Sequence, residues 1–281
     1  MTIKLAVAFG GAGTVGGAEV GAYMALEEIN DLLIQLLIGT SAGSIVAALA
    51  AMGYTGEQMK KITIDADYAN LINENIFNLI GGTLASNGNV IAWLQKLTEN
   101  KQMKDVSIPL ATITTDVVEA RPHAWDSRIY PDMPIHEAVY SSMAIPFIFK
   151  PYLNRYVDGG ATRNIPVQYL EGSAKIGIAI KESCEKGPIT GPFNMASRLI
   201  SLLLTDDDVL LEDWSKQVKI PIIQLPTDNA GFLERHMGLA QKEKLVDTGY
   251  QTMKAFLTSL RGKRWMSQAR KASETEPTPQ A

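Results

Sequence analysis

Hydrophobic runs alternate with glycine-rich and polar stretches along the first fifty residues. Apolar runs cover residues 3–9 and 32–38, and each is followed by a glycine-rich turn and a segment typical of a helix, at 18–30 and 42–52. A continuous apolar run bounded by glycines is typical of a strand covered on both faces. The order strand, helix, strand, helix therefore predicts βαβ connectivity, and with it a parallel sheet with right-handed crossovers.

The rest of the chain continues this pattern after one long interruption, residues 55–104, which we predict to be helical and loop-forming. Further elements are strands at 109–117, around 118–124, and at 154–158, 175–180 and 219–226, with helices at 193–204 and 236–260. No internal repeat or linker divides these elements. We predict a single domain over residues 1–265, with about 55–104 as a helical cap-like insertion, and a polar, proline-containing tail at 266–281 that is disordered.

Composition narrows the class of protein. The 281 residues carry a net charge of −4 and a pI near 5.5, which argues against nucleic acid as the main partner. The single cysteine, Cys184, excludes an internal disulfide framework and a multi-cysteine metal site. The apolar start has no cleavage-site pattern, and no stretch approaches 18 uninterrupted apolar residues. We therefore expect a cytoplasmic protein without a transmembrane helix.

The first motif is Gly11-x-Gly13-x-x-Gly16, which follows a predicted strand and opens a helix. This pattern resembles a dinucleotide-binding fingerprint, but that fingerprint needs an acidic residue at the end of the second strand. The second strand here ends in Gly39-Thr40-Ser41 instead, so we expect no nucleotide cofactor. The loop still offers a run of backbone N–H groups near a helix N-terminus, which favours binding of negative charge.

The second motif is Gly39-x-Ser41-x-Gly43, between the second apolar run and an alanine-rich helix. A serine nucleophile on such an elbow needs small neighbours, because its backbone is strained and adjacent elements crowd it. This placement would project the Ser41 hydroxyl beside the preceding glycine loop. The alternative is a tight strand–helix turn in which Ser41 only caps the helix.

A serine nucleophile requires a base. His123 and His136 lie in contexts typical of surface or boundary residues, whereas His236 lies late in the chain, where a Ser-His-Asp esterase has its histidine. Asp158 is a different base, at the end of an apolar strand and directly before Gly159-Gly160. An Asp-Gly pair is also a favoured hairpin turn, so by itself Asp158 leaves both interpretations open.

Together these motifs resemble the bacterial patatin-like phospholipases. The stretches GGAGTVGGAEVGAYMALEE, IGTSAGSIVAALAAMGY and YVDGGATRNIPV are similar to the glycine-rich block, the nucleophile elbow and the Asp-Gly-Gly/Ala motif of that family. The stretch AVYSSMAIPFIFKP, at 138–151, is similar to the segment just before its aspartate. The resemblance spans about residues 3–170.

The resemblance implies a three-layer α/β/α fold with a mainly parallel central sheet and a nucleophile elbow between strand and helix. It also implies a Ser41–Asp158 dyad without histidine, which hydrolyses carboxylic esters of phospholipids or lysophospholipids through an acyl-enzyme. The glycine loop would hold the oxyanion, and no metal or organic cofactor is implied. The residues assigned to that loop are Gly11, Ala12, Gly13, Thr14 and Gly16, and those supporting the dyad are Gly39, Gly43, Gly159 and Gly160.

Two positions depart from the family pattern. Ala12 replaces a glycine but keeps its N–H, whereas Val15 stands where the family has Arg or Lys. The loss of this cation removes a contact to an anionic headgroup or to the oxyanion. It motivates a further hypothesis, a weakly active lipid-binding or regulatory protein on the same scaffold.

The expected partner is a lipid or a membrane surface. Two sets of side chains are candidates for contacting it. The first set is apolar and could instead form the core of a helical cap. The second set is basic and could instead lie solvated at the end of a helix. The apolar set is Ile72, Ile76, Phe77, Leu79, Ile80 and Trp93, and the basic set is Arg261, Lys263, Arg264, Arg270 and Lys271.

Overall fold

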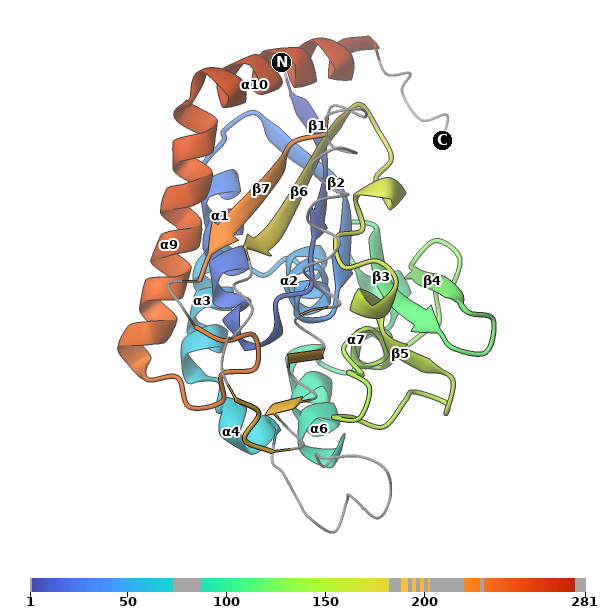
Figure 1. The fold of residues 1–281 in the computed structure, drawn as a ribbon. Coiled ribbons are helices and arrows are strands. Elements are labelled where there is room, and N and C mark those ends of the chain that lie inside the picture. The colour runs from blue at the N-terminus through green and yellow to red at the C-terminus, as the bar shows by residue number, and fades with distance from the viewer. Residues whose placement is uncertain are drawn as a thin grey trace.

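A mixed, mostly parallel sheet forms the centre of the computed structural model, as the sequence predicts (Figure 1). The structure describes residues 2–72, 87–181, 188–191, 194–195, 198–199, 202, 220–227 and 230–275. In this part of the chain the strand order is β4-β3-β2-β1-β6-β7, with β5 paired to β3. The strands are β1 (Ile3–Phe9), β2 (Leu32–Thr40), β3 (Leu110–Asp116), β4 (Arg121–Asp126), β5 (Tyr156–Asp158), β6 (Ala174–Lys181) and β7 (Ile222–Pro226).

Strand direction divides this sheet into two regions. The neighbours from β3 through β2, β1 and β6 to β7 run parallel, whereas β4 and β5 both run antiparallel to β3. The helices are α1 (Gly17–Glu27), α2 (Ala42–Ala51), α3 (Gly56–Asp65), α4 (Tyr68–Leu71), α6 (Asn87–Leu97), α7 (Ile135–Ser142), α9 (Leu239–Thr258) and α10 (Leu260–Thr275). Among the described helices, none has the length and apolar character needed to cross a membrane.

The two faces of the sheet carry different side chains because successive strand residues point to opposite sides. On β1 the large residues Leu5, Val7 and Phe9 belong to the main core, to which α1, α2, α7 and α9 also contribute. Ala6 and Ala8 face a smaller core on the other side, covered by the segment around residues 165–170. The predicted helix at 193–204 lies largely outside the described residues.

The end of the chain differs from the prediction. The helix expected at 236–260 is present as α9, whereas the tail expected to be disordered from residue 266 belongs to a further helix, α10, and is helical through Thr275. The prediction was wrong because α10 has a packed face: Trp265, Ala269 and Ser273, spaced four residues apart, are buried. The Ser273 hydroxyl accepts a hydrogen bond from the Lys4 N–H, and this contact attaches α10 to β1.

Helices α1 and α9 pack closely on one face of the sheet. A Cβ atom added at Gly249 of α9 would lie 1.8 Å from the carbonyl oxygen of Ala18 in α1. The contact is with backbone, so a larger residue at Gly249 cannot be accommodated by a side-chain rotation. The close approach of these helices therefore depends on glycine at this position.

We predict that Gly249→Ala lowers the free energy of unfolding by about 1–3 kcal/mol, because α1 and α9 must separate to accept the methyl group. Chemical denaturation followed by circular dichroism measures this difference. Gly231→Ala is the matched control, since a Cβ there meets nothing within 4 Å, and its effect should stay within about 0.5 kcal/mol. Equal stability of the two variants would contradict this account of the packing.

Candidate active site

Strands β2 and β5 lie along the same edge of β3 and run toward each other. The last residue of β2, Thr40, pairs with Ile113 of β3. The last residue of β5, Asp158, pairs with the next residue of β3, Thr114. Since β2 is parallel to β3 and β5 is antiparallel, the two strand ends meet, and Ser41 follows directly after Thr40. Residues 117 positions apart in the sequence are thereby brought together.

Ser41 lies on a strained turn between β2 and α2. Its φ of 52° and ψ of −128° lie in a region that L-residues rarely adopt. The turn is held by the Ser41 N–H, which donates to the Ser142 hydroxyl over 2.9 Å, and by the Ser44 hydroxyl, which donates to the Ser41 carbonyl over 2.6 Å. At Gly43 an added Cβ would lie 2.2 Å from the Gly10 carbonyl oxygen. The turn therefore packs directly against the glycine loop.

The hydroxyl of Ser41 donates a hydrogen bond to Oδ2 of Asp158 over 2.6 Å. The other carboxylate oxygen, Oδ1, accepts from the Gly160 N–H over 2.7 Å. The Asp158 backbone is fixed as well, because its N–H donates to the Ala144 carbonyl and its carbonyl accepts from the Thr115 hydroxyl. Both ends of the serine–carboxylate pair are thus oriented by the surrounding backbone.

The histidines lie elsewhere. In the described part of the chain, no histidine hydrogen-bonds to Ser41. His236 is exposed, His123 stacks among aromatic rings of the sheet region, and His136 of α7 lies 3.4 Å from the Gln95 amide. This arrangement favours the Ser41–Asp158 pair over the alternative with His236.

Burial raises the pKa of Asp158 from 3.8 to about 6, although the hydrogen bonds from Ser41 and Gly160 act in the opposite direction. The side chain is only 6% exposed, and Ser41 is 3% exposed. Desolvation destabilises the carboxylate relative to the protonated acid. A carboxylate with a raised pKa is a stronger base, and at neutral pH this group remains mainly ionised.

The glycine loop lies beside Ser41, but not all of its N–H groups face a free space. The Gly11 N–H donates to the backbone carbonyl and the side-chain Oδ1 of Asn164, each over 3.0 Å. The Thr14 N–H donates to the Phe232 carbonyl over 2.8 Å. The expectation that Gly11 and Thr14 supply oxyanion donors is therefore corrected.

Two N–H groups, between Gly11 and Thr14 in the loop, remain available as oxyanion donors. In the part of the chain that the structure describes, the N–H groups of Ala12 and Gly13 have no hydrogen-bond partner. Gly13 lines the same pocket as Ser41, and Gly16 ends the loop at the start of α1. The neighbouring Gly159 carbonyl accepts from the N–H groups of Thr162 and Arg163, which closes the turn after Asp158.

An apolar cavity of about 60 Å³ opens at Ser41. No charged side chain is among its described lining residues, which come from the glycine loop, the region of α2, α4 and α6, and the segments after α7 and before α9. Ile72 and Trp93 line it, while Ile76, Phe77, Leu79 and Ile80 lie outside the described residues. The lining consists of Gly13, Thr14, Ser41, Ala42, Ile45, Tyr68, Leu71, Ile72, Val90, Trp93, Met143, Ile145, Phe149 and Leu233.

Two side chains next to the glycine loop face the core. Val15 is buried in the main hydrophobic core and is not part of the described pocket lining. Glu19 in the first turn of α1 is fully buried, and burial raises the pKa of its carboxyl well above its usual range. Burial therefore disfavours the charged form of the Glu19 carboxyl behind the loop.

The basic set predicted to contact lipid lies at the other end of the sheet. It is carried by α10, which packs where β1 begins, whereas Ser41 follows the carboxyl end of β2 (Figure 1). Arg270 in this set forms an ion pair with Asp31, with Nε and Oδ2 2.8 Å apart. These cations therefore do not line the approach to Ser41.

Three positioning residues were not predicted: Ser142, Asn164 and Phe232. Ser142 lies in the stretch at 138–151, whose resemblance was a usable signal. Asn164 lies in the stretch YVDGGATRNIPV, whose resemblance was also a signal, but its contact with Gly11 forms only through the fold. Phe232 contacts Thr14 through its backbone carbonyl, which no side-chain pattern reveals.

The burial of Asp158 predicts that ionisation of its carboxyl destabilises the folded chain. Because its pKa is higher in the folded chain than in the unfolded one, stability falls as pH rises from about 4 to 6, by up to about 3 kcal/mol. We predict that Asp158→Asn raises the free energy of unfolding at pH 8 by about 1–3 kcal/mol and has little effect at pH 4. Denaturant titrations at both pH values measure this difference.

Asp116→Asn provides the opposite control. Hydrogen bonds from Arg155 lower the pKa of Asp116 to about 2, so the stability that this carboxylate contributes is present above pH 4 and is lost as pH falls toward 2. Asp116→Asn should therefore destabilise the chain at pH 8. A loss of stability at pH 8 in both variants would contradict the assignment of Asp158 as a buried, destabilising carboxylate.

This chain is similar to known proteins over most of its length. The chain is 25% identical over 287 residues to YqhO of Bacillus subtilis, covering 89% of this chain and 96% of that protein. It is 27% identical over 234 residues to "Probable lipid hydrolase 463L" of Invertebrate iridescent virus 6, covering 75% of this chain and 76% of that one. Among solved structures, VipD from Legionella pneumophila matches with a TM-score of 0.57 at 16% identity, covering 97% of this chain and 67% of VipD, which shows similarity of fold.

The family match covers the part of the chain that carries the site. Residues 7–171 match the family described as patatin-like phospholipase. This range contains the glycine loop, Ser41, Asp158 and Asn164. The chain therefore belongs to the patatin-like phospholipase family.

Proposed function

We propose that this protein hydrolyses carboxylic ester bonds of phospholipids or lysophospholipids through a Ser41–Asp158 dyad. The observation that carries the proposal is the 2.6 Å hydrogen bond from the Ser41 hydroxyl to the buried Asp158 carboxylate. A nucleophile and a base within hydrogen-bond reach, with the base oriented by a further group, is the arrangement that nucleophilic catalysis requires. Here the orienting group is the Gly160 N–H.

In the first half of the reaction, Ser41 Oγ attacks the acyl carbonyl carbon and its proton passes to Asp158 Oδ2. The carbonyl oxygen becomes an oxyanion, which the N–H groups of Ala12 and Gly13 stabilise. Loss of one such donor typically costs on the order of 10²–10³ in rate. The tetrahedral intermediate collapses, the ester C–O bond breaks, and Asp158 returns the proton to the leaving alcohol oxygen.

In the second half, water replaces the alcohol. Asp158 removes a proton from this water, whose oxygen attacks the carbonyl carbon of the acyl-Ser41 ester. The same loop N–H groups stabilise the second oxyanion. Collapse of this intermediate breaks the bond to Ser41 Oγ, Asp158 returns the proton to it, and a free carboxylic acid leaves.

The pocket at Ser41 favours binding of the acyl group of the substrate rather than binding of a charged headgroup. Its apolar lining around Ser41 favours burial of hydrocarbon. Val15 supplies no cation, and the described lining supplies none either, so recognition of a phosphate by this site is weak. Phe147, between the pocket residues Ile145 and Phe149, is 70% exposed and is suited to contact a membrane surface. We therefore propose action as a peripheral protein at lipid surfaces in the cytoplasm.

We predict that Ser41→Ala abolishes hydrolysis of lysophosphatidylcholine and that Asp158→Asn lowers kcat/KM by about 10²–10⁴-fold, because the general base is lost. In the natural chain log kcat/KM should rise with a slope of one below about pH 6 and level off above it, since Asp158 must be ionised. Product analysis by mass spectrometry, over a pH series, measures both effects.

His236→Ala is the control for the alternative of a Ser-His-Asp esterase. This variant should retain activity within about twofold, which corresponds to a change well under 1 kcal/mol in the activation barrier. Full activity in the Asp158→Asn variant, or its loss in the His236→Ala variant, would overturn the dyad. If the natural chain binds lysophospholipid without turnover and Ser41→Ala binds it equally well, the lipid-binding hypothesis replaces hydrolysis.

A further inference from the structure

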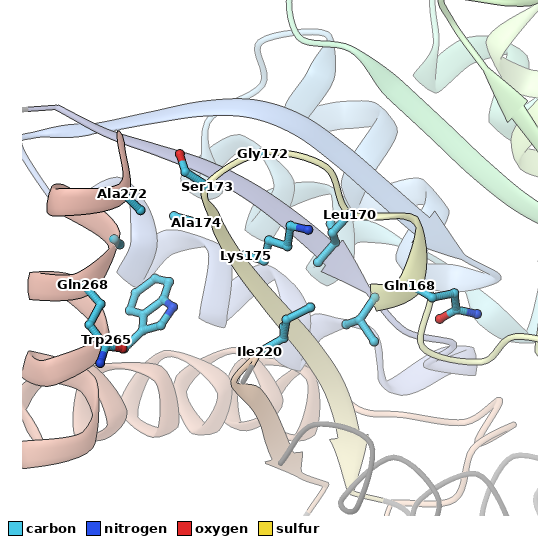
Figure 2. Close-up of a pocket in the computed structure, with 12 residues that line it drawn as sticks. Gln168, Leu170, Gly172, Ser173, Ala174, Lys175, Ile220, Trp265, Gln268 and Ala272 are labelled. Atoms are coloured by element: carbon cyan, nitrogen blue, oxygen red, sulfur yellow. The ribbon is translucent and has the colours of Figure 1, made fainter. Parts of the chain in front are cut away.

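A second and larger hollow lies at the other end of the sheet. Its volume is about 450 Å³, within the range typical of small-molecule sites. It is bounded by the start of β6, the segment at 167–172 and α10 (Figure 2). None of its lining residues lines the cavity at Ser41, so it is a separate site.

One wall of this hollow is apolar. The indole of Trp265 extends from α10 toward β6 (Figure 2) and is largely buried. Ala269 and Ala272 continue this wall along the same helix face, while Leu170 and Ile220 contribute from the opposite side. These side chains are largely buried, and a hydrocarbon chain in the hollow would cover the apolar area that they still expose.

The hollow has a single charged lining residue among those the structure describes, Lys175 of β6. Its side chain is half-buried and lies beside Leu170 (Figure 2). No residue that the structure describes forms an ion pair or a hydrogen bond with its ammonium group. A partly desolvated ammonium without a counter-charge favours an anion. The amide of Gln268 adds a hydrogen-bonding group from α10.

From these features we infer that the hollow binds a small amphipathic carboxylate, with its anionic group on Lys175 and its alkyl chain against Trp265, Leu170 and Ile220. A carboxylate carries one negative charge and matches one ammonium, whereas a phosphate dianion would require further cations or a guanidinium fork. This binding site goes beyond the proposed ester hydrolysis and does not depend on it.

The test uses the full chain carrying Ser41→Ala, so that neither binding nor its failure depends on turnover. Octanoate titrated by isothermal calorimetry should bind at one saturable site. Octan-1-ol, which has the same chain length without the charge, should bind at least about tenfold more weakly, since a charge-assisted hydrogen bond is lost. Absence of saturable octanoate binding, or equal affinity for the alcohol, would overturn the proposal.

Three further substitutions locate the site. Lys175→Gln should weaken octanoate binding by about tenfold, whereas Lys181→Gln, at an exposed position of the same strand, should leave the affinity unchanged. Ala272→Phe should abolish binding by filling the hollow while circular dichroism shows that the fold is kept. Octanoate bound in the Ser41 cavity would be insensitive to both Lys175→Gln and Ala272→Phe, and that result would refute the assignment.

Discussion

One edge of strand β3 determines how this site is built. Strand β2 pairs with the first half of that edge and β5 with the second half, in opposite directions. Their ends meet at the adjacent residues Ile113 and Thr114, which brings Ser41 and Asp158 into hydrogen-bond contact. Because both side chains are positioned by backbone pairing in a sheet, their separation is fixed by the register of the strands. A slip of either strand would separate the pair.

The site also combines two unfavourable features that the surrounding structure must stabilise. Ser41 has a strained backbone, and Asp158 is a buried carboxylate whose pKa is raised by desolvation. Hydrogen bonds from the Ser41 N–H to Ser142 and from the Gly160 N–H to Asp158 hold these groups in place. The same burial that destabilises the Asp158 carboxylate makes it a better base. In the proposed mechanism, stability and reactivity are therefore opposed at this residue, as is typical of active sites.

Much of the fold could be predicted from the sequence, because apolar runs and glycine turns are local signals. The strands around 3–9, 32–38, 109–117 and 175–180 are present with small changes in their ends. The helical end of α10 was missed, since its polar composition hides a narrow packed face at Trp265 and Ala269. Of the site, the motif residues were recognisable. The sequence did not reveal which loop N–H groups already donate hydrogen bonds within the fold, because Asn164 and Phe232 reach the loop only through tertiary contacts.

The central claim is that the Asp158 carboxylate activates the Ser41 hydroxyl. Labelling with a fluorophosphonate, followed by peptide mapping by mass spectrometry, tests it most directly because the reagent reports nucleophilicity without a lipid substrate. The account predicts a single adduct on Ser41 in the natural chain, formed at least about 10²-fold more slowly in the Asp158→Asn variant. An adduct on another residue, or labelling of Ser41 at an unchanged rate in the Asp158→Asn variant, would contradict it.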